Sequence, residues 1–175
     1  MSDRLIFLII LITFCQVVQA QKGEVSVSAG PLLSLGTKDD INVQLKTGLG
    51  LEVSVQYNFT DRSAVVAEAG LASFSIKNRI GPDTGTRYRE TINSFKIGYR
   101  YTFGATGIYS NILYGIDKYP DNSIAGTSTI SILGVGRRFT LKNLYFIDAG
   151  FDFISSISPR FNIKAVFGLR LPKDK

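Results

Sequence analysis

The side chains that could perform chemistry are few, because the sequence contains no histidine and only one cysteine, Cys15. Enzymes that hydrolyse esters or transfer acyl groups commonly use an imidazole as the base, since it titrates near neutral pH. Zinc and related metals also depend on histidine or thiolate ligands. We therefore predict that the protein is not an enzyme and has no catalytic residues, no metal site and no cofactor.

Carboxylates are the remaining candidates for acid–base chemistry, in the pairs Glu52 with Glu68 and Asp148 with Asp152. Charges of both signs occupy alternate positions of the same segments, which favours mutual neutralisation in a shared interior over catalysis. The predicted interior network consists of Glu52, Glu68, Lys96, Arg100, Asp148, Asp152, Lys164 and Arg170. Five of its members are expected at similar heights, namely Glu52, Glu68, Lys96, Asp148 and Lys164.

These charges belong to segments in which apolar and polar side chains alternate. In residues 43–59 the odd positions are apolar apart from Thr47, and the even positions are polar, charged or glycine. A β-strand sends successive side chains to opposite faces, so this segment has one apolar and one polar face. Strands are usually about 5–6 residues long, and a much longer one is typical of a wall between hydrocarbon and water.

Seven further segments have the composition of strands, and no stretch has a convincing helical period. The eight expected strands cover residues 24–35, 42–59, 62–77, 86–103, 106–118, 126–140, 143–154 and 159–171. The third places Phe74 and Ile76 on the face of Glu68, and the sixth changes phase near Ile132-Leu133. A β-bulge, or a stretch that projects beyond a membrane, would explain either irregularity.

Short and long connections alternate between these strands. Tight turns follow the second, fourth and sixth strands, and longer loops follow the first, third and fifth. Bacterial outer-membrane barrels have short periplasmic turns, longer external loops and an even number of strands. The pattern therefore predicts an all-β, eight-stranded, antiparallel up-and-down transmembrane β-barrel with both chain ends in the periplasm.

The polar faces suit the inside of a narrow barrel better than a surface in water. Glycine recurs on them although it weakens strands, and narrow interiors need small residues beside bulky ones. Eight strands leave an interior that side chains fill, so we expect no open pore. The alternative is a soluble periplasmic or secreted barrel that binds an apolar ligand in its interior.

The first twenty residues have the pattern of a signal peptide, a short apolar run followed by small residues at Val18-Gln19-Ala20. The run is too short for a transmembrane helix. The predicted domains are a signal peptide over residues 1–20 and an outer-membrane β-barrel domain over residues 21–175, exported to the bacterial outer membrane. A lipid-modified Cys15 is the other interpretation, but Phe14 stands where lipoprotein signals have a small residue.

Several short motifs are similar to those of small outer-membrane β-barrel proteins. They are Val25-Ser26-Val27-Ser28-Ala29-Gly30, Gly48-Leu49-Gly50-Leu51-Glu52, Phe95-Lys96-Ile97-Gly98-Tyr99-Arg100-Tyr101, Leu133-Gly134-Val135-Gly136 and Phe161-Asn162-Ile163-Lys164. The chain resembles the eight-stranded OmpX/OmpA-type barrels and, more closely, the outer-membrane β-barrel domain family that includes PorT-like proteins. The resemblance is specific for architecture, and its PorT-like part suggests an accessory role in secretion or envelope biogenesis. The leading functional interpretation is a structural or cell-surface interaction role.

The net charge of +6 is spread along the chain, which gives nucleic-acid binding little support. One basic cluster precedes and begins the fourth strand, where Arg79, Arg87 and Arg89 are placed to contact lipopolysaccharide phosphates. The alternative is that these arginines belong to a solvated loop. We expect a monomer in contact with outer-membrane lipid, and the sequence identifies no protein partner.

Overall fold

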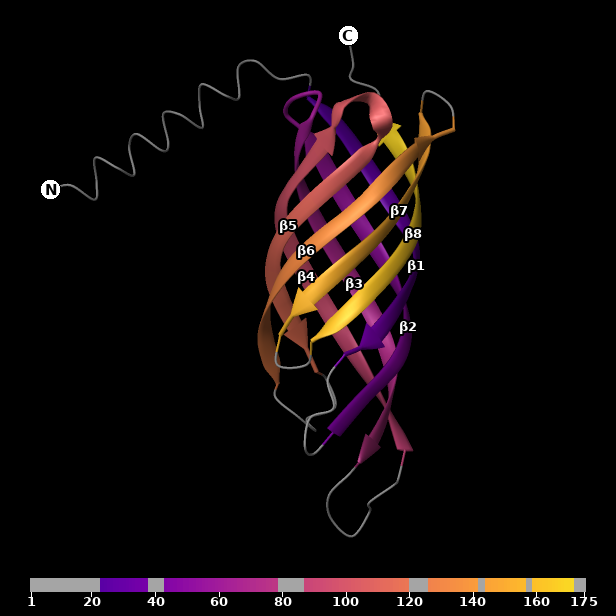
Figure 1. The fold of residues 1–175 in the computed structure, drawn as a ribbon, viewed down its shortest axis with the longest axis vertical. Coiled ribbons are helices and arrows are strands. Elements are labelled where there is room, and N and C mark those ends of the chain that lie inside the picture. The colour runs from indigo at the N-terminus through magenta and orange to yellow at the C-terminus, as the bar shows by residue number, and fades with distance from the viewer. Residues whose placement is uncertain are drawn as a thin grey trace, which may run out of the picture.

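The computed structural model describes residues 23–37, 43–78, 87–119, 126–141, 144–156 and 159–171. Over these ranges eight antiparallel strands close into one barrel, each strand pairing with its neighbours in the sequence and the last with the first (Figure 1). The strands are β1 (Glu24–Gly36), β2 (Val43–Asn58), β3 (Ser63–Asn78), β4 (Arg87–Phe103), β5 (Ile108–Lys118), β6 (Thr127–Thr140), β7 (Tyr145–Ser155) and β8 (Arg160–Leu171). The predicted eight-stranded barrel is confirmed, and the expected strand bounds agree within two residues.

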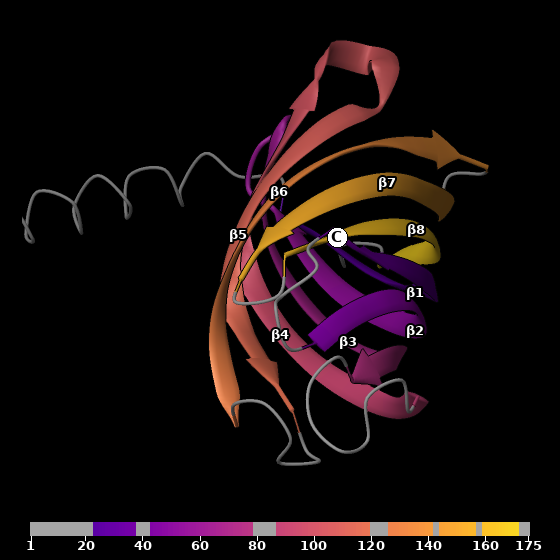
Figure 2. The ribbon, with the colours of Figure 1, turned by 60° about the horizontal axis from the view of Figure 1, so that its bottom comes forward.

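The strands wrap round a common interior, as Figure 2 shows with the lower end of the barrel turned forward. The start of β1, the end of β8 and the turn at residues 59–62 lie together at the upper end of the barrel in Figure 1. We call this end the short-turn end and the opposite one the long-loop end. No helix within the described residues is long and apolar enough to cross a membrane.

The tight turns are held by local hydrogen bonds. Thr60 Oγ1 accepts hydrogen bonds from the backbone N–H groups of Arg62 and Ser63, at 3.2 and 2.9 Å. A 3₁₀ turn, η1 (Gly104–Thr106), joins β4 to β5, and Gly107 follows it with a φ of +71°, a conformation that glycine adopts readily. Because of η1, β5 begins at Ile108, two residues later than the sequence pattern predicts.

Apolar side chains point outwards along every strand. On β2, Leu49 and Leu51 are 69% and 59% exposed, whereas Gly48 and Glu52 on the opposite face are buried. The exposed apolar residues on other strands include Val65, Ile97, Ile112, Leu133, Phe151 and Phe167. This is the arrangement of a barrel surrounded by hydrocarbon. It argues against the soluble alternative, in which the apolar face would point inwards.

The interior nevertheless contains apolar clusters, and these explain the two irregular strands. On β6 the even positions from Ser128 to Gly134 are all buried, and pairing with β5 and β7 is continuous. The predicted change of phase is therefore wrong, since Ile130 and Ile132 pack inside the barrel with Val66, Leu113 and Ile154. From the sequence alone, an isoleucine that points into the barrel looks the same as a strand whose alternation has shifted by one residue.

The irregularity expected on β3 lies on its partner strand. Phe74 is fully buried and points to the same interior as Glu68, so β3 itself keeps its phase there. The register between β2 and β3 shifts between Leu45 and Gly48, where two residues of β2 stand opposite one of β3. This is the geometry of a β-bulge, and Gly48 on its inner side lies against the Phe74 ring.

Large inward side chains lie over glycines on neighbouring strands. The Phe146 ring covers Gly168, and the Tyr109 hydroxyl end lies against Gly136 and Gly150. A Cβ atom added at Gly168 would overlap the Phe146 ring. Small residues beside bulky ones thus fill the narrow interior, as the glycine content of the polar faces indicates.

Replacing Gly168 with valine should destabilise the barrel, because the new side chain needs the space of the Phe146 ring. We expect the free energy of unfolding to fall by about 1–3 kcal/mol, the usual cost of overpacking. Urea unfolding in detergent micelles, followed by far-UV circular dichroism, measures it. The matched control is Gly126→Val, where an added Cβ meets no atom within 4 Å. Equal urea midpoints of unfolding for the two variants would contradict the close packing of the Phe146 ring over Gly168.

Candidate functional site

Two lysines and three carboxylates meet in the middle of the barrel. Lys164 Nζ lies 2.9 Å from Glu52 Oε1, Glu68 Oε1 and Asp152 Oδ2. Lys96 Nζ lies 2.8 Å from Glu68 Oε2 and also pairs with Glu52 Oε2. All five side chains are buried. We call this group, Glu52, Glu68, Lys96, Asp152 and Lys164, the central cluster.

Four of its five members stand directly opposite a glycine on an adjacent strand. Glu52 pairs with Gly30 on β1 and with Gly70 on β3. The remaining three pairs are Lys96 with Gly115, Asp152 with Gly134, and Lys164 with Gly150. Paired residues point to the same face of a sheet, so a glycine leaves its partner's side chain free to extend into the lumen. The charged side chains reach one another across the interior because of these glycines.

An arginine cluster lies next to the central cluster, nearer the short-turn end. Arg100 Nη1 donates to Asp148 Oδ2 at 2.9 Å, and Arg138 donates to both oxygens of the same carboxylate at 2.8 Å. Both arginines also donate to Gln56 Oε1, and Arg100 Nε donates to Asn111 Oδ1. We call Arg100, Arg138, Asp148, Gln56 and Asn111 the arginine cluster.

Aromatic rings support both guanidinium groups of the arginine cluster. The Arg100 guanidinium lies 4.0 Å from the centroid of the Tyr109 ring, and that of Arg138 lies 3.8 Å from the centroid of the Phe146 ring. Rings in this position attract cations and stabilise them away from water. The bulky residues that fill the interior therefore also hold the arginines in place.

A third ion pair lies nearer the long-loop end. Arg160 Nη1 lies 2.7 Å from Asp117 Oδ2, and both side chains are buried. Ser94 Oγ donates to the same aspartate through Oδ1 at 2.6 Å. Asn162 accepts a hydrogen bond from Ser34 at 2.6 Å in the same half of the barrel. Charged and polar groups are therefore paired with one another on both sides of the central cluster.

The interactions cross the lumen and do not merely follow the wall. Lys164 on β8 reaches Glu52 on β2 and Glu68 on β3, although β8 pairs only with β1 and β7. Arg100 on β4 reaches Asp148 on β7 in the same way. Side chains that bridge non-adjacent strands occupy the space a channel would need. At this height the described interior is filled by paired charges.

The structure brings seven of the eight predicted network residues into these two clusters. The eighth, Arg170, lies apart at the short-turn end, with its Nε 3.4 Å from Glu24 Oε1. The expectation of equal heights is wrong for Asp148, which belongs to the arginine cluster, whereas Asp152 lies beside Lys164. Tilted strands are staggered in a barrel, so equal distance from a turn does not give equal height.

Some interior partners were missed by sequence reasoning. Arg138 lies on β6, where the supposed change of phase concealed that it shares the inward face of Ile132. Arg160 and Asp117 stand near strand ends, where a charge is usually interpreted as solvent-exposed. The even-number spacing of Arg138 from Gly134 and Gly136 was the signal that could have identified it.

The central cluster resembles a cation site in its donors. Carboxylate oxygens of Glu52, Glu68 and Asp152 lie within 4.8 Å of one another, a spacing that suits a hard cation. However, the ammonium groups of Lys96 and Lys164 already contact these oxygens. The lysines supply the positive charge that a metal ion would otherwise provide.

The basic cluster proposed for lipopolysaccharide is described only in part. Arg79 lies outside the described residues. Arg87 is the first residue of β4, and only its backbone is described. Arg89, two residues further along, is exposed. The structure therefore places Arg89 on the surface near the long-loop end and does not assemble the three arginines.

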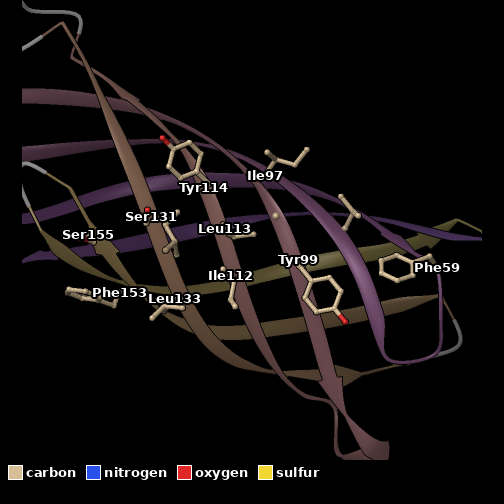
Figure 3. A pocket seen from close by; sticks show the side chains of 13 residues that line it. Phe59, Ile97, Tyr99, Ile112, Leu113, Tyr114, Ser131, Leu133, Phe153 and Ser155 are labelled. Carbon is tan, nitrogen blue, oxygen red and sulfur yellow. The ribbon is translucent and has the colours of Figure 1, made fainter. Parts of the chain in front are cut away.

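The outer face carries a hollow of about 1010 Å³ over β4, β5 and β6 (Figure 3). Its lining includes Tyr99, Ile112, Tyr114 and Phe153. The lining is almost entirely apolar, and it belongs to the face that is exposed to hydrocarbon. A lipid acyl chain has the chemistry to fill it.

Comparisons with known proteins agree with this architecture. The family model described as outer membrane protein beta-barrel domain matches residues 6–166. The comparison with curated proteins gives no match.

Solved structures share the fold at low sequence identity. Ail of Yersinia pestis, the attachment invasion locus protein, is 18% identical with a TM-score of 0.55, over 85% of this chain and 99% of Ail. OprG of Pseudomonas aeruginosa is 11% identical with a TM-score of 0.57, over 87% and 98% of the two chains. Neisserial surface protein A is 13% identical with a TM-score of 0.52, over 86% and 99%. At these identities the similarity establishes the fold alone.

Replacing Lys164 with methionine should strongly destabilise the protein, because three buried carboxylates lose a cation they share. We expect a loss of about 3–5 kcal/mol in the free energy of unfolding, as for a broken buried ion pair. Far-UV circular dichroism during urea unfolding measures it, since the chain has no tryptophan. Lys118→Met, at an exposed position of β5, is the control.

The double variant Lys164→Met with Asp152→Asn separates charge from packing. The double variant gives the central cluster the same net charge as in the unmodified protein, one carboxylate more than lysines. We therefore expect part of the lost stability to return. A double variant as unstable as Lys164→Met alone, or a single variant as stable as the unmodified protein, would contradict the role assigned to the cluster.

Proposed function

Since the chain belongs to the outer membrane protein β-barrel domain family, we propose that it is a closed, non-conducting and non-catalytic barrel of the bacterial outer membrane with a structural or cell-surface interaction role. The observation that carries this proposal is the central cluster. Its lysines and carboxylates bridge non-adjacent strands and occupy the lumen at mid-height. A barrel filled in this way offers its outer surface and its two ends for interactions.

We propose that the protein is not catalytic because of the chemistry of the central cluster. The carboxylates Glu52 and Glu68 are buried and held by two lysines, so neither is free to exchange protons with a substrate. The sequence contains no histidine that could replace them as a base. Each of these charges is held by a partner, and removing one partner would leave a buried charge uncompensated.

The targeting of the chain is part of the same proposal. Residues 1–20 act as a signal peptide that directs residues 21–175 to the outer membrane. An apolar exterior on every strand supports insertion into a bilayer. A role as an accessory component of secretion or envelope biogenesis remains the second candidate, and the accessible surfaces at both barrel ends are where such partners would bind.

Planar-bilayer recordings test the non-conducting barrel. We expect the refolded protein to insert without steady conductance steps, because ion pairs between non-adjacent strands close the lumen. Heat-modifiable gel mobility verifies folding in the same preparation, and a general porin is the positive control. Reproducible ohmic steps that disappear when the sample is heat-denatured would contradict the proposal.

The surface role has a specific form, contact between lipopolysaccharide phosphates and Arg79, Arg87 and Arg89. The exposure of Arg89 supports it, as does the preference of guanidinium groups for phosphate. Ail, which has the same fold, has been crystallised with the heparin analogue sucrose octasulfate, a polyanion.

Changing the three arginines to glutamine should reduce the lipopolysaccharide that co-purifies with the protein by several-fold. A parallel variant with lysine at the same positions keeps the charge but not the forked geometry, and we expect an intermediate amount. Co-purified lipopolysaccharide is measured by silver staining of gels after detergent extraction, which distinguishes it from phospholipid. Equal amounts in all three proteins would favour the solvated-loop interpretation and contradict the contact.

A further inference from the structure

A polar hollow of about 620 Å³ opens at the short-turn end of the barrel, beside the arginine cluster. Its volume lies within the range of about 300–1,000 Å³ that is typical of small-molecule sites. Five arginines line it, Arg62, Arg100, Arg137, Arg138 and Arg170. We call it the periplasmic vestibule, because tight turns mark the periplasmic end of such barrels.

Positive charge exceeds negative charge in the vestibule. Its described lining contains two carboxylates, Glu24 and Asp61, and Glu24 pairs with Arg170. At its inner end Asp148 pairs with both Arg100 and Arg138, and Arg100 also lies 4.0 Å from Glu68 Oε1 of the central cluster. The Arg138 side chain remains 14% exposed, so part of its guanidinium faces the opening. The lining of the vestibule therefore carries five arginines against two carboxylates, and Arg138 is the cation of its inner end that reaches the opening.

The rim adds two more cations. Arg62 lies in the turn between β2 and β3, and Arg137 lies near the end of β6. Neither forms an ion pair with a carboxylate among the residues that the structure describes. Arg137 instead contacts the Phe139 ring, with its guanidinium 5.1 Å from the ring centroid. Both arginines are exposed, and among the described residues no ion pair has to break before either approaches an anion. Arg137 lies on the outward face of β6 and reaches the rim from outside.

The geometry points to a phosphate-type oxyanion as the ligand. The arginines come from β4, β6, β8 and a turn, so they surround the hollow. A carboxylate offers two oxygens in one plane, whereas a phosphate accepts hydrogen bonds in several directions and carries more charge. We propose that the vestibule binds such a group, supplied either by a phosphorylated solute of the periplasm or by the headgroup of an inner-leaflet phospholipid.

Calorimetric titration of the refolded full chain with inorganic pyrophosphate tests the proposal. We expect saturable binding that weakens as salt rises, because the contacts are charge–charge. Arg62→Gln and Arg137→Gln should each weaken it about three- to tenfold, the effect of losing one ordinary hydrogen bond at a solvent-exposed rim. Asp61→Asn should tighten it, and Lys118→Gln, an exposed cation at the opposite end of the barrel, is the matched control.

The rim variants spare the ion-pair network, so unchanged heat-modifiable mobility should accompany the weaker binding. No saturable binding, or equal affinity in the unmodified protein and the Arg62→Gln/Arg137→Gln double variant, would overturn the site.

Nanodiscs distinguish the two sources of the oxyanion. If a lipid headgroup occupies the vestibule, pyrophosphate should bind more weakly in nanodiscs of phosphatidylglycerol than in detergent, and the double variant should lose this difference. If the ligand is a free solute, the unmodified protein should bind pyrophosphate equally well in both. Either result supports the oxyanion site, whereas an absence of binding in both environments refutes it.

Discussion

A charge inside a membrane-spanning barrel must be neutralised by another charge, and this constraint organises the interior. An unpaired ion away from water costs several kcal/mol, so each carboxylate of the central cluster needs a cation within contact distance. Lys96 and Lys164 meet this need for three carboxylates at once. The glycines opposite the charged residues follow from the same constraint, because long side chains must extend through the space that a partner leaves open.

The interior is asymmetric along its axis. Apolar clusters that include Phe74, Ile92 and Ile130 fill much of the half toward the long-loop end. Arginines and their amide partners occupy the half toward the short-turn end, where the interior opens to water. The long-loop half combines this apolar packing with one buried ion pair, Arg160 with Asp117. The short-turn half is the one in which charged side chains border an opening.

Most of the architecture could be predicted from the sequence because strand alternation has a fixed period. Strand number, connection lengths and the inward direction of Glu52 and Lys164 follow from that period alone. The partners of each charge could not be predicted in the same way. Whether Asp148 or Asp152 contacts Lys164 depends on the stagger between strands, which no single segment encodes. The inward isoleucines of β6 were ambiguous for a related reason, since an apolar residue fits both faces of this barrel.

The order of the central cluster along the chain links charge pairing to closure of the barrel. Glu52, Glu68 and Lys96 lie on β2, β3 and β4, and this early half carries one carboxylate more than it has lysines. Lys164 arrives only on β8, the strand that closes the sheet against β1. The ion pairs of Lys164 with Glu52 and Glu68 therefore form only when β8 completes the barrel, so the interior reaches its full set of paired charges at the same step as the sheet closes.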